Sequence, residues 1–116
     1  MGDRGNIFVK DTTYKKSTGI YLYSHWGGSE LKQTLQTALK KFPDRWTDEP
    51  YLTRIIFSEM IKDHVDGETG FGISTYETDN EHDIIMLDPG TQTVTIGEKK
   101  WTFKKFCELD LKQKEV

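Results

Sequence analysis

Two consecutive helical patterns in the middle of the chain, over residues 29–42 and 47–65, constrain the fold most strongly. In the first, apolar residues recur at helical spacing, and Ser29 is available as the N-cap. Pro43 ends this pattern, because proline cannot donate the backbone hydrogen bond that a continuing helix needs. In the second, Thr47 is available as the cap, and apolar residues cover well over half of the circumference. The sequence therefore predicts an amphipathic surface helix followed by a more deeply buried central helix.

Strand patterns flank the two helices. Residues 6–10 and 20–24 are rich in β-branched and aromatic side chains and enclose the polar stretch 11–19, which predicts a hairpin with a long loop. Three further strands are predicted after the helices, over residues 71–76, 83–87 and 92–96. The order β-β-α-α-β-β-β predicts an α+β fold, a two-layer sandwich of a mostly antiparallel sheet with two helices on one face.

The 116 residues suit a single domain over 1–116, since domains most often contain about 100 to 150 residues. We expect frayed ends near 1–5 and 110–116. The pattern over 101–109 permits a strand, a helix or both.

Helices on one face leave the other face of the sheet open. Alternation in the second strand places Tyr21, Tyr23 and His25 on one face and aliphatic residues on the other. The aromatic face is then expected to meet water, a ligand or a second copy, so we expect a homo-oligomer, most simply a homodimer.

Charge and composition exclude several classes of protein. Sixteen basic against nineteen acidic residues give a net charge of −3, which argues against a duplex nucleic acid partner. No apolar run approaches a membrane span, and no signal peptide is recognisable, so we expect no membrane partner. Cys107 is the single cysteine, and no zinc-binding spacing occurs. We expect a soluble cytoplasmic protein, in the host cell cytoplasm if it is phage-encoded, with no cofactor and no metal.

The corner over residues 25–29, His-Trp-Gly-Gly-Ser, is the first candidate site. Its glycines let the backbone approach a ligand, the following helix offers free N–H groups, and Trp26 or Tyr23 could stack on a flat ring. Alternatively, the glycines only turn the chain, Ser29 caps the helix and Trp26 fills the core beneath.

Residues 79–83, Asp-Asn-Glu-His-Asp, are the second candidate site, suited to acid/base or metal chemistry if a second histidine approaches. The catalytic set in that case is His25, Glu81, His82 and Asp83. The alternative is a solvated turn made by Asp79 and Asn80. Between the helices, Arg45 and Trp46 could clamp an anion and stack on it, or simply close the core.

Five segments resemble a group of small bacterial and phage-type proteins, over roughly residues 20–103. They are His-Trp-Gly-Gly (25–28), Arg-Trp (45–46), Tyr-Leu-Thr-Arg-Ile-Ile-Phe (51–57), Gly-Phe-Gly-Ile-Ser-Thr-Tyr (70–76) and Asp-Asn-Glu-His (79–82). The resemblance brings no activity with it. It implies only an association with counter-defence, in which small phage-type proteins act as inhibitors or as sponges for a ligand.

The resulting expectation is a non-enzymatic binding protein that sequesters a small nucleotide-like or anionic ligand. One alternative is a small metal-assisted or acid/base hydrolase that uses His25 and His82. Another is an inhibitor that binds a host protein through the acidic 77–83 loop. The expected ligand-binding residues are Tyr23, His25, Trp26, Gly27, Gly28, Ser29, Arg45, Trp46, Asn80 and His82.

Overall fold

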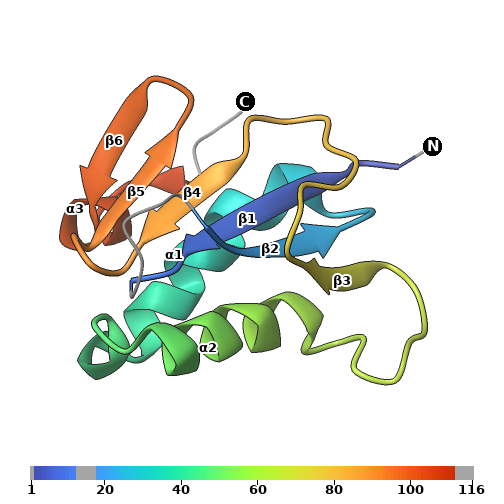
Figure 1. The fold of residues 1–116 in the computed structure, drawn as a ribbon, viewed down its shortest axis with the longest axis horizontal. Coiled ribbons are helices and arrows are strands. Elements are labelled where there is room, and N and C mark those ends of the chain that lie inside the picture. The colour runs from blue at the N-terminus through green and yellow to red at the C-terminus, as the bar shows by residue number, and fades with distance from the viewer. Residues whose placement is uncertain (1, 13–17, 112–116) are drawn as a thin grey trace.

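The computed structural model describes residues 2–12 and 18–111. Parts of the expected loop over 11–19 and of the end at 110–116, namely 13–17 and 112–116, lie outside the described residues. The described strands form one six-stranded sheet in the order β3-β2-β1-β4-β5-β6 (Figure 1). Their bounds are β1 (Gly5–Lys10), β2 (Gly19–Ser24), β3 (Phe71–Ser74), β4 (Ile85–Asp88), β5 (Thr93–Ile96) and β6 (Lys99–Thr102).

Two longer helices pack on one side of this sheet, which confirms the α+β fold (Figure 1). They are α1 (Leu31–Lys41), preceded by the 3₁₀ turn η1 (Gly28–Glu30), and α2 (Glu49–Ile61), preceded by the 3₁₀ turn η2 (Pro43–Arg45). A short third helix, α3 (Phe103–Cys107), follows β6 directly. The segment over 101–109 is therefore both strand and helix, and the Thr102 side chain caps α3 by accepting from the backbone N of Lys105.

The core lies between the sheet and the helices. Ile7, Leu22 and Leu87 of the sheet pack there against Leu35 and Ile56 of the helices, all fully buried or nearly so. Burial of this apolar surface is the main term that stabilises the fold. Trp46 joins the core from its edge, where its indole N donates to the Leu39 carbonyl at 2.9 Å.

Several expected boundaries need correction. The cap of α2 is Asp48 rather than Thr47, since the Asp48 side chain accepts from the backbone N of Tyr51. The helix ends at Ile61 rather than near 65, and Val65 is exposed. Only Leu52, Ile56 and Met60 of α2 are buried, so α2 is half-exposed instead of central.

One strand pairing differs from a simple succession of hairpins. β1 pairs with β4 in parallel, with Ile7 opposite Ile85 and Val9 opposite Leu87, whereas the other four pairings are antiparallel. Hydrophobic alternation cannot distinguish the two directions, because both place every second side chain on the same face. The parallel pair decides where the candidate loops lie.

The outer face of the sheet is partly covered, contrary to a fully open aromatic face. The segment between β3 and β4 crosses it in front of β2 and β1 (Figure 1). Phe8 is buried on this face beside Tyr21, with ring centroids 4.7 Å apart, and Tyr21 and Tyr23 are half-buried. No helix among the described residues is long and apolar enough to cross a membrane.

Candidate functional site

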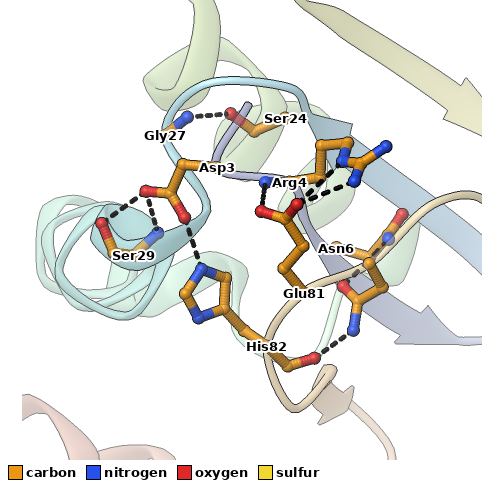
Figure 2. A network of polar contacts seen from close by, with 9 residues as sticks. Asp3, Arg4, Asn6, Ser24, Gly27, Ser29, Glu81 and His82 are labelled. Atoms are coloured by element: carbon orange, nitrogen blue, oxygen red, sulfur yellow. Dashed lines mark hydrogen bonds and ion pairs between the residues drawn. The ribbon is translucent and has the colours of Figure 1, made fainter. Parts of the chain in front are cut away.

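One end of the sheet gathers segments that lie far apart in the sequence. Because β1 and β4 are parallel, both begin at this end, and the antiparallel β2 finishes here. The residues before β1, the corner after β2 and the loop before β4 therefore meet (Figure 2). The patterns left open whether the 25–29 and 79–83 loops converge, and the structure brings them together across residues 2–4.

Asp3 lies between the two loops and binds both (Figure 2). Its Oδ2 accepts from the Ser29 backbone N at 3.0 Å and from the Ser29 Oγ at 2.6 Å, and its Oδ1 lies 2.5 Å from Nε2 of His82. These bonds, the one from the Ser29 hydroxyl foremost, lower the pKa of Asp3 from 3.8 to about 2. Asp3 therefore caps the turn that leads into α1, in place of the expected Ser29, whose own side chain caps nothing there.

The backbone N–H groups of residues 27–30 have internal acceptors. Gly27 N donates to Ser24 Oγ (3.0 Å), Gly28 N to the Asp3 carbonyl (2.6 Å), Ser29 N to the Asp3 carboxylate (3.0 Å) and Glu30 N to the Gly27 carbonyl (2.9 Å). The Asp3 carboxylate thus takes the place that a bound anion would take at a helix N-terminus. The N–H groups of residues 27–30 are therefore not free to cradle a phosphate.

Serine, aspartate and histidine meet here in an order that does not activate the serine. In a nucleophilic triad the histidine lies between the other two and takes the serine proton. Here Asp3 is in the middle, with the Ser29 hydroxyl on one carboxylate oxygen and His82 on the other. A carboxylate with a pKa of about 2 is too weak a base to remove a serine proton. The cluster therefore ties segments together and does not make a nucleophile.

Arg4 makes a second tie to the same loop. Its Nη2 and Nε donate to Oε2 of Glu81 at 2.7 and 3.2 Å, and its backbone N donates to Oε1 at 3.1 Å. Its Nη1 also lies 3.2 Å from Oδ2 of Asp79. The bonds from Arg4 lower the pKa of Glu81. Because these groups are partly exposed, the pairs mainly position the loop and add little stability.

Asn6 of β1 binds residues 78–80 of the loop before β4 through its side chain. It is almost fully buried, and its Nδ2 donates to the Asp79 carbonyl at 3.1 Å and to Oδ1 of Asn80 at 3.2 Å. Oδ1 of Asn6 accepts from the Thr78 hydroxyl at 3.4 Å. The Asn80 amide donates in turn to the His82 carbonyl. The side chain of Asn80, expected as a ligand-binding residue, therefore forms hydrogen bonds with Asn6 and His82.

The stability of wild-type protein relative to Asp3→Ala is expected to depend on pH. The pKa of Asp3 is depressed in the folded state, so its contribution is fully present above about pH 4 and is lost as the pH falls toward 2. Urea unfolding of both proteins between pH 2 and 7 should give a difference that is constant at neutral pH and shrinks below pH 4. A difference that stays constant down to pH 2 would contradict the assigned contacts.

His25 and Trp26 both lie at the surface. Nδ1 of His25 lies 2.7 Å from Oη of Tyr23, and its ring meets Trp26 edge to face at 4.8 Å. Trp26 is 60% exposed, so it does not fill the core beneath the corner. A Cβ added at Gly70, where φ is +101°, would lie 2.8 Å from Cζ3 of the indole. The exposed ring is therefore held in place by contacts with the His25 ring and the Gly70 backbone.

A groove of about 540 Å³ opens beside Trp26, lined by α1, by the end of α2 and the turn after it, and by the first residue of β3. Thr34 and Thr37 line its α1 side, and their hydroxyls donate to carbonyls of the preceding turn, which leaves the hydroxyl oxygens as acceptors. His64 lines the opposite side, with its ring 5.6 Å from that of Phe71. None of these three polar residues was among the expected ligand-binding set.

Arg45 and Trp46 do not belong to this end of the molecule. They follow α1, whereas the corner precedes it, and the 11 residues of that helix separate the two places by about 16 Å. Arg45 lies over the Tyr51 ring at 4.8 Å and 3.4 Å from Asp48. Trp46 packs edge to face against Phe103, with centroids 5.5 Å apart. Both sets of contacts agree with the alternative in which Arg45 and Trp46 pack against the protein and do not bind an anion.

The residues of the alternative hydrolase set are not brought into one cluster. Within the described part of the chain His25 contacts Tyr23 and Trp26 while His82 contacts Asp3, and no contact joins the two imidazoles. The Asp83 side chain, just before β4, lies next to the β5–β6 turn, where a Cβ on Gly97 would be 2.9 Å from its Oδ2. Over residues 2–12 and 18–111 no three His, Cys, Asp or Glu side chains are grouped so as to hold a metal ion.

Asp3, Arg4 and Asn6 organise this end of the sheet, and the sequence reasoning missed all three. Residues 1–5 were expected to be frayed, whereas Gly5 pairs with Ser24 in the sheet and Asp3 and Arg4 bind both loops. The available signal was an Asp-Arg pair directly before a strongly apolar strand. It could indicate ordered charges, but not their partners 26 and 77 residues away.

Comparison with protein-family models gives no match, and neither curated proteins nor solved structures give one.

Proposed function

We propose that this chain is a non-enzymatic binding protein that holds a flat, uncharged or cationic ring, such as a nucleoside, against Trp26. The observation that carries the proposal is the Trp26 indole, which is 60% exposed and yet contacts both the His25 ring and the Gly70 backbone. An aromatic ring that is held in place before binding loses little conformational freedom when a ligand stacks on it.

The groove beside Trp26 supports a small ligand. Its volume of about 540 Å³ falls in the range of about 300 to 1,000 Å³ typical of small-molecule sites. The Thr34 and Thr37 oxygens on α1 and the His64 ring on the far side offer hydrogen-bonding groups. Such groups can orient a ring with amide-like edges after it stacks.

Charge argues against a phosphate in the groove. Its charged side chains are Glu30, Glu59, Asp63 and Lys62, three acidic against one basic. Burial acts to raise the pKa of Glu59, but hydrogen bonds from Lys41 and Lys62 outweigh it and lower that pKa. Lys62 is thus already paired, at 2.8 Å, and Glu30 and Asp63 leave the groove negative. This favours the nucleoside part of the expected nucleotide-like ligand over the anionic part.

Calorimetric titration with adenosine, guanosine, cytidine and uridine and with their 5′-monophosphates tests the proposal. At least one nucleoside should bind the wild type, and its monophosphate should bind several-fold more weakly. Trp26→Ala should reduce nucleoside affinity by about tenfold or more, because stacking of a base on an aromatic ring contributes about 1–3 kcal/mol.

Tyr51→Ala is the matched control. Tyr51 is 54% exposed, but it lies at the start of α2 beside Arg45 and outside the groove. Its loss should leave nucleoside affinity unchanged. If Trp26→Ala binds as the wild type does, or if the monophosphates bind more tightly than the nucleosides, the proposed ligand chemistry is wrong.

The counter-defence role expected for a phage-type protein belongs to the same proposal, since a binder without turnover acts by removing its ligand from solution. Chromatography of the titrated ligand separates this from the hydrolase alternative. The wild type should return the ligand intact. The hydrolase would be established if the wild type converts the ligand to product, and if His25→Ala and His82→Ala still bind the ligand but no longer form product.

A further inference from the structure

β3 forms one edge of the sheet (Figure 1). The alternation of its hydrogen bonds with β2 shows which backbone groups face outward. The His25 backbone N donates to the Gly70 carbonyl at 2.9 Å, in line with the β2–β3 register. Bonded pairs alternate with non-bonded pairs in an antiparallel ladder, so Gly72 bonds to Tyr23. The N–H and carbonyl groups of Phe71 and Ile73 therefore point away from β2, and no described residue bonds to them.

The two edges of the sheet differ in how they are protected. At the far edge, β6 carries the exposed Lys99 and Lys100, and charged side chains of this kind oppose the addition of another strand. The β3 edge has no charged residue from 69 to 76. Instead it exposes Ile73 (60%) and Tyr76 (69%). An uncharged edge with exposed apolar side chains and free backbone groups is suited to pairing with a further strand.

We propose that β3 pairs with β3 of a second copy of this chain, so that two sheets join into one continuous sheet across a twofold axis. A twofold antiparallel pairing centred on Ile73 places Phe71 opposite Thr75 of the second copy and Gly72 opposite its Ser74. The residues with outward-facing backbone groups, Phe71 and Ile73, then form the hydrogen-bonded positions on both copies.

The uncharged β3 edge is suited to a second copy of itself. No charged side chain of either copy lies opposite another charge in the paired segment, so the acidic chain does not repel itself there. A groove of about 960 Å³ lies beside β3, with Ile20, Ile73 and Tyr76 among its lining residues, and adds apolar surface near this edge.

The interface is small, because a single short strand pair buries less surface than a standard stable interface of about 1,600 Å². We therefore expect a weak dimer with a dissociation constant on the order of micromolar. Sedimentation equilibrium over a range of protein concentrations should show the mass rising from that of the 13.5 kDa chain toward twice that value.

Ile73→Lys should remain monomeric at every concentration, because two ammonium groups would face each other at the axis. Val65→Lys is the matched control: Val65 is also exposed (66%) but lies outside β3, and this variant should dimerise as the wild type does. A wild type that stays monomeric up to several hundred micromolar, or a dimer that persists in Ile73→Lys, overturns the proposal.

Amide hydrogen exchange provides a readout that does not depend on a substitution. In wild-type protein the amides of Phe71 and Ile73 should exchange more slowly as the concentration rises, since only these β3 amides gain a partner on pairing. The amide of Gly72 already bonds to Tyr23 and should change less. Rates at Phe71 and Ile73 that are independent of concentration while the mass doubles would place the interface elsewhere and refute the proposal.

Discussion

Gly28→Ala is expected to lower the free energy of unfolding by about 2–3 kcal/mol, near the upper end for overpacking a tight site. A Cβ at this position would lie 2.7 Å from the carbonyl oxygen of Asp3, 2.8 Å from Cδ2 of His82 and 2.9 Å from the carbonyl carbon of Arg4. Two of these atoms belong to the backbone, so no side-chain rotation relieves the clash. The chain before β1 has to move away from the corner. Thermal unfolding should show a decrease in Tm of roughly 8–12 °C.

Gly67→Ala provides the control for the general effect of replacing glycine. The nearest atom to a Cβ at Gly67 is the His64 carbonyl oxygen at 3.4 Å, an ordinary contact, and φ is not in the left-handed region. Its Tm should stay within about 2 °C of the wild type. Equal effects of the two substitutions would show that the corner is not closely packed against Asp3 and His82.

Asp3→Ala is expected to lower the free energy of unfolding by about 2 kcal/mol. The change removes the acceptor of two Ser29 hydrogen bonds and the contact of His82, and it leaves the first turn before α1 without a cap. Loss of a capping side chain costs about 0.5–2 kcal/mol, and a hydrogen bond to a charged group adds to this. Urea unfolding at pH 7 measures the difference.

Asp44→Ala controls for the loss of a surface carboxylate. Asp44 is exposed in η2, at the other end of α1, and its replacement should change the free energy of unfolding by less than about 0.5 kcal/mol. If Asp3→Ala is equally mild, the residues before β1 do not hold the two loops. Hydrogen exchange should also show faster exchange at the Ser29 amide in Asp3→Ala, because its acceptor is gone.

These expectations rest on contacts with the residues before β1, which local pattern does not indicate. Gly28 reads as part of a turn signal, and Asp3 as a charged residue near a chain end. Asp3 bonds to Ser29 and His82, 26 and 79 positions away, and Gly28 packs against Asp3 and His82. Position in the sequence argued for fraying, whereas burial and hydrogen bonding decide whether a terminus is ordered.

The candidate loops were identified in sequence, but the side chains in them take different parts from those expected. Trp26 lies at the surface, where a stacking role needs it, while the polar groups of Asn80 and Ser29 form hydrogen bonds within the chain. Arg45 lies beyond the far end of α1. Aromatic and glycine-rich composition marks a place where a ligand can approach, but it does not say which N–H groups remain free.

Local sequence determined the elements of this protein. Apolar spacing, Pro43 and the Asp-Pro-Gly-Thr turn at 88–91 define two helices and the strands around them, because helix and strand periods and backbone restrictions act over a few residues. The direction of β4 beside β1 was decided only by the tertiary structure, since parallel and antiparallel strands show the same alternation. That pairing brings Asp3, the 25–29 corner and the 79–83 loop to one end of the sheet. It also fills the helix N-terminus with a carboxylate of the chain itself, and so places the proposed binding surface at Trp26.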